Sequence, residues 1–305
     1  MINKSNNKKH DRIGITNLNN YGSKMTIIEY NNCHSITVKF DNGYIVHTNY
    51  YNFEKGNVQN PYDKSVLNVG FLGEGIYKSG ITEGKHTIQY EYWHSMLRRC
   101  FDEKWKEKHP SYKDVTCCNE WLCFQNFATW FDENYYNFDK ERLELDKDIL
   151  HKGNKIYNPI DCIFAPKTIN TLFIQHKNKR NNLPIGVCLT KQSTKFQSKC
   201  MVRDYNKKRN KKVYLGLYNT PEEAFNAYKQ FKEQYIKQVA DEYKDKIPQK
   251  LYEAMYNYEV EITDGIHKQY FKQWEVKYEA IKINIINNKR NDIKFSYDDM
   301  VFNFK

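Results

Sequence analysis

The lysine and arginine side chains of residues 184–231 are the group whose types and spacing most clearly suggest chemistry. Both side chains bind phosphate oxygens through charge-assisted hydrogen bonds. Here they alternate with apolar residues in short runs, which predicts strands that present cations on one face. An ordinary solvated basic loop is the alternative. The candidate contacts, with one amide among them, are Lys191, Lys195, Gln197, Lys199, Arg203, Lys208, Arg209 and Lys212.

Three strands and a helix are the elements that must position these cations. Apolar runs at 185–189, 196–202 and 213–218 predict the strands. Thr220 is a predicted N-cap, and Glu223 three residues later completes a capping box. The apolar face of this helix is expected to cover one side of the sheet and to leave the other side free.

The segment from 184 to 246 resembles the APETALA2-type DNA-binding domain of plant ethylene-response factors, which also occurs in phage homing endonucleases. In that family the sheet lies in the major groove, so the resemblance implies double-stranded DNA as a partner. The family usually has Arg after Gly-Val, whereas this chain has Cys188, so one bidentate guanine contact is missing. The matching residues are Gly186-Val187, Lys195-Phe196, Val213 to Thr220, Glu222 to Ala224 and Ala227-Tyr228.

A second group of candidate residues lies between Leu143 and Phe173. This stretch predicts a strand, a polar loop, a second strand and a helix, which together form a ββα unit. It resembles the HNH nuclease core, in particular phage variants in which a helical pair with a Cys-x-Glu-Trp element, here Cys118 to Trp121, precedes the unit. The resemblance implies that Asp146 and Asn170 hold one divalent metal ion, Mg²⁺ or another, and it places Asp161 near the orienting asparagine of the family.

Lys147 stands where the family has its catalytic histidine. A base for phosphodiester hydrolysis must be neutral near pH 7, which suits histidine, with a pKa of about 6.5, and not lysine, with a pKa of about 10.4. His151 could act as a substitute base beside Asp146, and Asp148 could add a second carboxylate to the metal.

Three functions therefore stay open. In the first, the chain is a phage-type double-stranded DNA-binding protein whose ββα unit has lost catalysis and binds phosphate through Lys147, Lys152 and Lys155. In the second, it is an active metal-dependent HNH homing endonuclease with Asp146 and His151 in catalysis. In the third, it binds RNA through the aromatic residues of its N-terminal segment. A divalent metal cofactor is implied only by the second.

Composition agrees with a polyanionic partner. With 48 Lys and Arg against 37 Asp and Glu the formal net charge is +11, which favours association with nucleic acid. No apolar run is long enough to span a membrane, so we expect no membrane partner and a cytoplasmic location, in the bacterial host if the gene is phage-encoded. The eight cysteines contain no C-x-x-C pair. Most are expected to be buried thiols, and a metal site at Cys100, Cys117 or Cys118, and Cys123 is the alternative.

The predicted fold class is α+β with several modules. Residues 1–11 form a disordered basic N-terminus, 12–70 a small β module, and 71–87 a glycine-rich connector. Residues 88–180 form the helical pair with the ββα unit, 184–246 the APETALA2-like domain, and 247–305 C-terminal helices and a tail. An aromatic stripe on the predicted helix over 267–286 is a candidate homodimer contact.

Overall fold

The computed structural model describes residues 12–81, 84–138, 141–173, 183–190, 195–204, 209–264, 272, 274–281 and 283. The chain is mixed α+β, as predicted. It divides into two compact units, residues 1–136 with 151–162 and residues 137–150 with 163–305. No helix in the described part of the chain is both long enough and apolar enough to cross a membrane. The predicted disordered segment 1–11 lies outside the described residues.

The first unit begins with a four-stranded antiparallel sheet in the order β1-β2-β3-β4. Its strands are β1 (Thr16–Leu18), β2 (Lys24–Asn32), β3 (Ser35–Phe40) and β4 (Ile45–Thr48). Gly43, with a φ of +93°, supplies the positive φ that the turn before β4 needs. The strand β4 ends at Thr48, and Asn49 caps a short helix, α1 (Tyr50–Glu54). The predicted small β module is therefore present, with this helix added.

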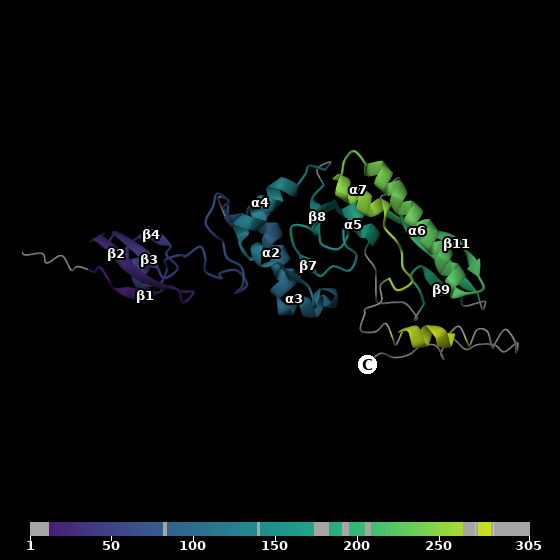
Figure 1. Cartoon of the computed structure of the whole chain (residues 1–305), viewed down its shortest axis with the longest axis horizontal. Helices are drawn as coiled ribbons and strands as arrows, with labels where there is room; N and C mark the ends of the chain where they lie inside the picture. The colour runs from purple at the N-terminus through teal and green to yellow at the C-terminus, as the bar shows by residue number, and fades with distance from the viewer. Residues whose placement is uncertain are drawn as a thin grey trace, which may run out of the picture. The chain divides into compact units, whose positions relative to one another are not determined.

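Helices form the rest of the first unit (Figure 1). They are α2 (Ile88–Phe101), α3 (Glu103–Lys108) and α4 (Phe124–Asn134), with a short parallel pair, β5 (Thr116–Cys117) and β7 (Ile156–Tyr157). The first helix of the predicted helical pair is divided into α2 and α3 at Asp102. Its side chain accepts a hydrogen bond from the Trp105 backbone N–H at 3.0 Å and so caps α3. The next predicted helix begins at Phe124, after a 3₁₀ turn over Asn119–Leu122.

The second unit contains the predicted strand, strand and helix. The strand β6 (Leu143–Asp146) pairs antiparallel with β8 (Ile163–Pro166), and α5 (Lys167–Phe173) follows directly. Leu145 of β6 and its cross-strand partner Phe164 are both buried. Most of the connection between the two strands, residues 151–162, belongs to the first unit.

A three-stranded antiparallel sheet and a long helix complete the second unit (Figure 1). The elements are β9 (Val187–Leu189), β10 (Phe196–Asp204), β11 (Arg209–Tyr218), α6 (Pro221–Tyr243) and α7 (Gln249–Tyr256). The predicted capping box is present: Thr220 accepts from the Glu223 backbone N–H at 3.2 Å, and the Glu223 carboxylate accepts from the Thr220 N–H at 3.2 Å. The three strands and the capped helix thus lie where the sequence predicted them.

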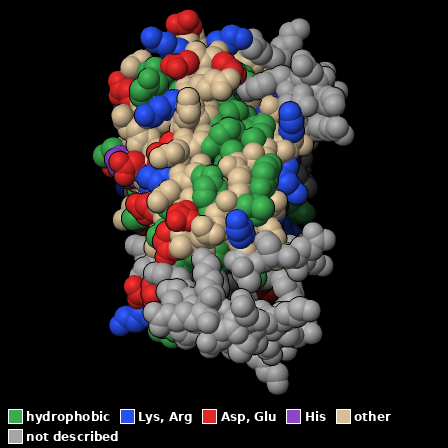
Figure 2. Space-filling model, turned by 90° about the vertical axis from the view of Figure 1, so that its right-hand side faces the viewer, with side chains coloured by type: hydrophobic (Ala, Val, Ile, Leu, Met, Phe, Trp, Pro, Cys, Tyr) green, Lys and Arg blue, Asp and Glu red, His purple; other side chains and the backbone are tan. Residues whose placement is uncertain are grey.

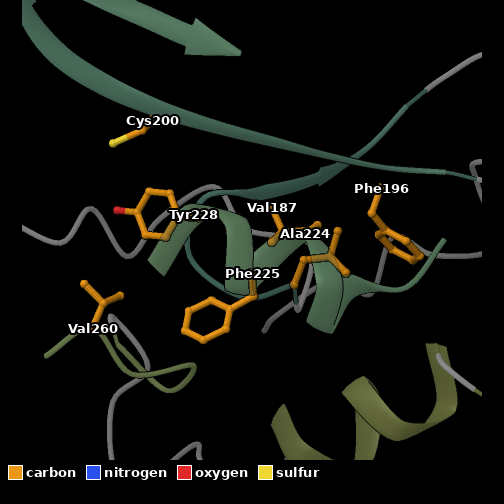
Figure 3. Close-up of a cluster of buried hydrophobic side chains, with 8 residues drawn as sticks. Val187, Phe196, Cys200, Ala224, Phe225, Tyr228 and Val260 are labelled. Atoms are coloured by element: carbon orange, nitrogen blue, oxygen red, sulfur yellow. The ribbon is translucent and has the colours of Figure 1, made fainter. Parts of the chain in front are cut away.

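One hydrophobic cluster joins this sheet to α6, and Figure 3 shows its side chains. Gly186 lies against the ring of Tyr228: a Cβ at this glycine would be 2.1 Å from Tyr228 Cδ2, and its φ of +79° disfavours other residues. The helix is therefore pressed closely onto the sheet at this point. The labelled members of the cluster are Val187, Phe196, Cys200, Ala224, Phe225, Tyr228 and Val260.

The predicted C-terminal helix is described only in part. Residues 274–281 are helical, and Trp274 and Tyr278 are buried within the chain, where their rings stack at a centroid distance of 4.8 Å. Two residues of the proposed dimer stripe thus already have neighbours in the same chain. Homodimerisation through this stripe stays a prediction.

Candidate nucleic-acid interface

The sheet of β9, β10 and β11 has an inner face packed on α6 and an outer face. Side chains alternate between the two faces along a strand. In β10, Phe196 and Cys200 are buried in the cluster with α6. Gln197, Lys199 and Met201 occupy the alternate positions, and Met201 is 48% exposed. These three residues therefore lie on the outer face. They and their cross-strand partners form the surface that we call the outer sheet face.

A β-bulge places two further side chains on the outer sheet face. The pairing of β10 with β11 shifts between Ser198, which faces Gly216, and Lys199, which faces Tyr214. Leu215 is the additional residue, and Gly216 has the positive φ of +133°. Tyr214 and Leu217 are three residues apart, so an unbroken strand would point them in opposite directions. With the bulge both lie on the outer face, 55% and 46% exposed.

The predicted DNA-binding residues are only partly gathered on this face. Lys199 is paired with Tyr214, and Lys212 with Met201, so both lysines lie on it. Lys195 is exposed just before β10. Arg203 belongs to the same face, and its guanidinium donates a hydrogen bond to the Thr168 hydroxyl on α5. Lys191 and Lys208 lie outside the described residues, and Arg209 is described only as the first residue of β11.

The outer sheet face is less uniformly cationic than the sequence predicted. Met201, Tyr214 and Leu217 give it an apolar centre, and Lys199 and Lys212 lie beside them. Figure 2, which views the side of the molecule that carries β11 in Figure 1, shows hydrophobic side chains gathered together with lysine and arginine side chains next to them. The sequence analysis assigned the cations to this face and missed the three apolar residues, because the bulge determines where two of them point.

Cys188 and Gln197 form a polar pair on the same face. They are cross-strand partners on β9 and β10, and the Cys188 thiol donates to Gln197 Oε1 at 3.4 Å. Leu217 faces Gln197 from the other side. One row across the sheet thus consists of a thiol, an amide and an apolar side chain.

Asp146, the predicted metal ligand, lies at the end of β6. One carboxylate oxygen, Oδ1, accepts the backbone N–H groups of Asp148 and Ile149, both at 2.8 Å. Burial, with a smaller contribution from the negative charge of Asp148, raises the pKa of Asp146 to about 7. Burial therefore favours the protonated carboxyl, and Oδ1 already holds the turn after the strand.

Lys147 is buried, contrary to the prediction that it contacts phosphate from an exposed loop. Only 7% of the residue is exposed, and its Nζ lies 3.0 Å from Asp148 Oδ2. Leu143 and Leu145 of β6 are buried, and Lys147 and Ile149 are buried in the turn that follows the strand. A buried lysine that is paired with a carboxylate is poorly placed to contact a DNA backbone.

Asn170, the second predicted metal ligand, donates its amide N–H to Glu144 Oε2. Glu144 and Asp146 are two residues apart on β6 and so lie on one side of it. Glu144 was missed by the sequence analysis, although the same alternation would have indicated it. Among the described residues, no group of three or more His, Cys, Asp or Glu side chains is arranged to hold a metal ion. The set Glu144, Asp146 and Asn170 thus offers two carboxylates and an amide oxygen.

His151 and Asp161 lie in contact in the first unit. His151 Nδ1 lies 2.7 Å from Asp161 Oδ1, and Asp161 Oδ2 accepts a hydrogen bond from the Asn158 amide at 2.7 Å. The His151 side chain is 67% exposed. Lys152 is exposed on the same loop, and Lys155 is half-buried. The predicted catalytic residues therefore divide between the units, with His151 and Asp161 in the first and Asp146 and Asn170 in the second.

The expectation that most cysteines are buried holds only in part. All eight are free: Cys100, Cys162 and Cys200 are buried, four others are half-buried, and Cys33 is exposed. A hydrogen bond with Cys100, and then burial, raises the pKa of the Cys117 thiol. Protonated thiols are poor metal ligands.

No family model matches the sequence, and comparisons with curated proteins and with solved structures also found no match.

Proposed function

We propose that the chain binds double-stranded DNA through the outer sheet face. The observation that carries the proposal is the position of Lys199 and Lys212 on either side of an exposed apolar centre, on a sheet whose other face is closed by α6. The net charge of +11 favours a polyanionic partner in the same way. Apolar side chains between the lysines suit contact with base edges on the floor of a DNA groove, whereas a purely electrostatic contact with phosphates would not need them.

The shape of the sheet supports duplex DNA over a single strand. A two-stranded antiparallel ribbon fits the major groove, where base edges are accessible. β10 and β11 form such a ribbon, paired from Phe196–Tyr218 to Asp204–Arg209. Single-strand binding relies instead on aromatic platforms, and the outer sheet face offers only Tyr214 in its described part. The resemblance to APETALA2-type domains, in which the corresponding sheet enters the major groove, supports the same partner.

Binding to labelled nucleic acids tests this proposal. A duplex of random sequence, the matching single-stranded DNA and a single-stranded RNA of equal length are titrated with the full chain at one fixed salt concentration. The duplex is expected to bind most tightly, and unlabelled duplex to compete best. Preferential binding of the RNA would instead support the N-terminal aromatic residues as the interface, and no binding to any of the three would refute nucleic-acid binding.

A second candidate function, metal-dependent DNA cleavage, is favoured by the pairing of His151 with Asp161. The 2.7 Å contact to Asp161 engages Nδ1 of the imidazole, so Nε2 is the nitrogen that could act as a general base. A divalent metal ion would have to be held by oxygen atoms of Glu144, Asp146 and Asn170, where it would polarise the phosphate and favour the ionised form of Asp146. Cleavage requires His151 and the candidate metal-binding residues to act on one DNA molecule.

A plasmid-nicking assay with Mg²⁺ or Mn²⁺ separates the two candidates. Cleavage that disappears in Asp146→Ala and in His151→Ala, but persists in the exposed-lysine variant Lys250→Ala, would establish the nuclease. No cleavage with either metal, together with intact duplex binding, is expected if the protein only binds DNA.

A further inference from the structure

We infer that the outer sheet face selects A·T base pairs in the major groove, with its apolar side chains on thymine methyl groups and Gln197 on adenine. The inference rests on the proposed duplex binding and specifies the substrate class of the same face. Two independent features of the face carry it: the exposed apolar centre formed by Met201, Tyr214 and Leu217, and the orientation of the Gln197 amide by Cys188.

The apolar centre fits a thymine methyl. The C5-methyl of thymine is the apolar group that unmodified base pairs present in the major groove, where it is matched by apolar side-chain contacts. Leu217 and Met201 are 46% and 48% exposed and stand on neighbouring strands of the sheet. Lys199 and Lys212 lie beside them and can reach phosphates at the groove edges. A surface with cations around an apolar centre therefore complements a duplex that has methyl groups along its groove floor.

The Cys188–Gln197 pair fits adenine. A glutamine amide reads adenine by donating from Nε2 to N7 and accepting at Oε1 from N6. The one thiol proton of Cys188 has two acceptors, Gln197 Oε1 at 3.4 Å and the Gln197 backbone oxygen at 3.8 Å, and the shorter contact distinguishes the oxygen end of the amide from the nitrogen end. The carbonyl oxygen has a second lone pair, so it can still accept from adenine. Cys188 thus acts as a positioning residue for Gln197.

The described part of the face presents its cations as lysines and one arginine. Guanine is read by an arginine or a lysine that donates to O6 and N7, and the fork of arginine matches both acceptors at once. Arg203 is the one arginine whose side chain is described on β10 and β11, and its guanidinium is bonded to Thr168. Cys188, on the neighbouring strand, is no guanine reader. The selectivity for A·T therefore rests on the apolar contacts and on Gln197, with Lys199 and Lys212 on phosphates.

Selection from randomised duplexes followed by base substitution tests the inference. The full chain is expected to enrich a run of A·T pairs. Replacing the thymines of the selected site by uracil removes only the methyl groups and is expected to weaken binding by roughly threefold for each methyl contacted. In Leu217→Ala the difference in affinity between the thymine duplex and the uracil duplex should shrink. In Leu217→Met this difference should be retained. Gln197→Ala should lose on the order of tenfold discrimination at one adenine.

Cys188→Ser and Cys188→Val separate positioning from packing. Serine keeps a proton donor to Gln197 Oε1, so it should retain the adenine preference, whereas valine keeps the side-chain volume without a donor and should reduce it. Thermal melting confirms that each variant is folded. A selected site rich in G·C, or equal binding to thymine and uracil duplexes, would refute the inference and leave duplex binding intact. Failure to bind any duplex would refute both this inference and the proposed function.

Discussion

Replacing Asp146 by asparagine should make the protein more stable at alkaline pH. Burial raises the pKa of Asp146 from 3.8 to about 7, because the ionised carboxylate is partly removed from water and lies near Asp148. Asparagine keeps an Oδ1 that can accept the two backbone N–H groups of Asp148 and Ile149, but it carries no charge. The substitution therefore removes the charge and preserves the turn.

The sign of the effect follows from proton linkage. The folded protein binds a proton at Asp146 more tightly than the unfolded chain does, so the free energy of unfolding falls as the pH rises from 3.8 to about 7. At about 1.4 kcal/mol per pH unit this loss amounts to at most about 4 kcal/mol, and residual solvent access to the carboxyl makes it smaller. The asparagine variant avoids the loss. Its advantage over the wild type should be absent near pH 4 and complete above pH 7.

Urea unfolding at pH 4.5 and pH 8 measures this advantage. The free-energy difference between Asp146→Asn and the wild type should be larger at pH 8 by roughly 1 to 4 kcal/mol. Asp245→Asn, at an exposed carboxyl after α6, is the matched control and should give the same difference at both pH values. A pH-independent difference for Asp146→Asn would contradict the assigned burial and pKa of this carboxyl.

Three further predictions concern packing, capping and thiol reactivity. Gly186→Ala should lower the free energy of unfolding by about 2 to 5 kcal/mol, since its Cβ would meet Tyr228 at 2.1 Å. Gly153 has a similar φ of +81° and no atom within 4 Å of a Cβ, so Gly153→Ala should cost less stability in thermal melting. Equal costs for the two variants would exclude the contact with Tyr228 as the cause. Thr220→Ala should cost about 1 kcal/mol and Thr220→Ser much less, and equal losses by urea titration would show that the capping hydroxyl is unimportant. In native protein treated with iodoacetamide at pH 8, mass spectrometry should find Cys33 alkylated well before Cys117, because the hydrogen bond with Cys100 raises the pKa of Cys117; the reverse order would contradict that contact.

Local signals in the sequence were sufficient to predict most of the helices and strands and their capping residues. The box at Thr220 and Glu223 needs only residues that are close in the chain, and it was predicted correctly. Asp102 carries a similar local signal, since aspartate is a favoured N-cap, and it explains why the predicted helix is divided. The burial of Lys147 was not indicated by these local signals, because β6 ends at Asp146 and Lys147 lies in the turn that follows.

Contacts between distant segments could not be predicted in the same way. The bond between Glu144 and Asn170 depends on how α5 returns to β6, and the partners are 26 residues apart. The outward positions of Tyr214 and Leu217 depend on a bulge whose location is set by the pairing with β10. Gly216 indicated an irregular strand, but the register shift that defines the outer sheet face is visible only in the folded sheet.

The salt dependence of duplex binding tests the central claim most directly. Affinity for one duplex is measured from 50 to 200 mM salt for the wild type, for Lys199→Ala with Lys212→Ala, and for the control Lys237→Ala with Lys250→Ala, which removes the same charge from α6 and α7. If the outer sheet face binds DNA, the first double variant should lose roughly 1.8 units of log–log slope, at about 0.9 for each phosphate contact, and the control should lose little. Equal slopes for the wild type and the Lys199, Lys212 variant would show that DNA does not bind this face.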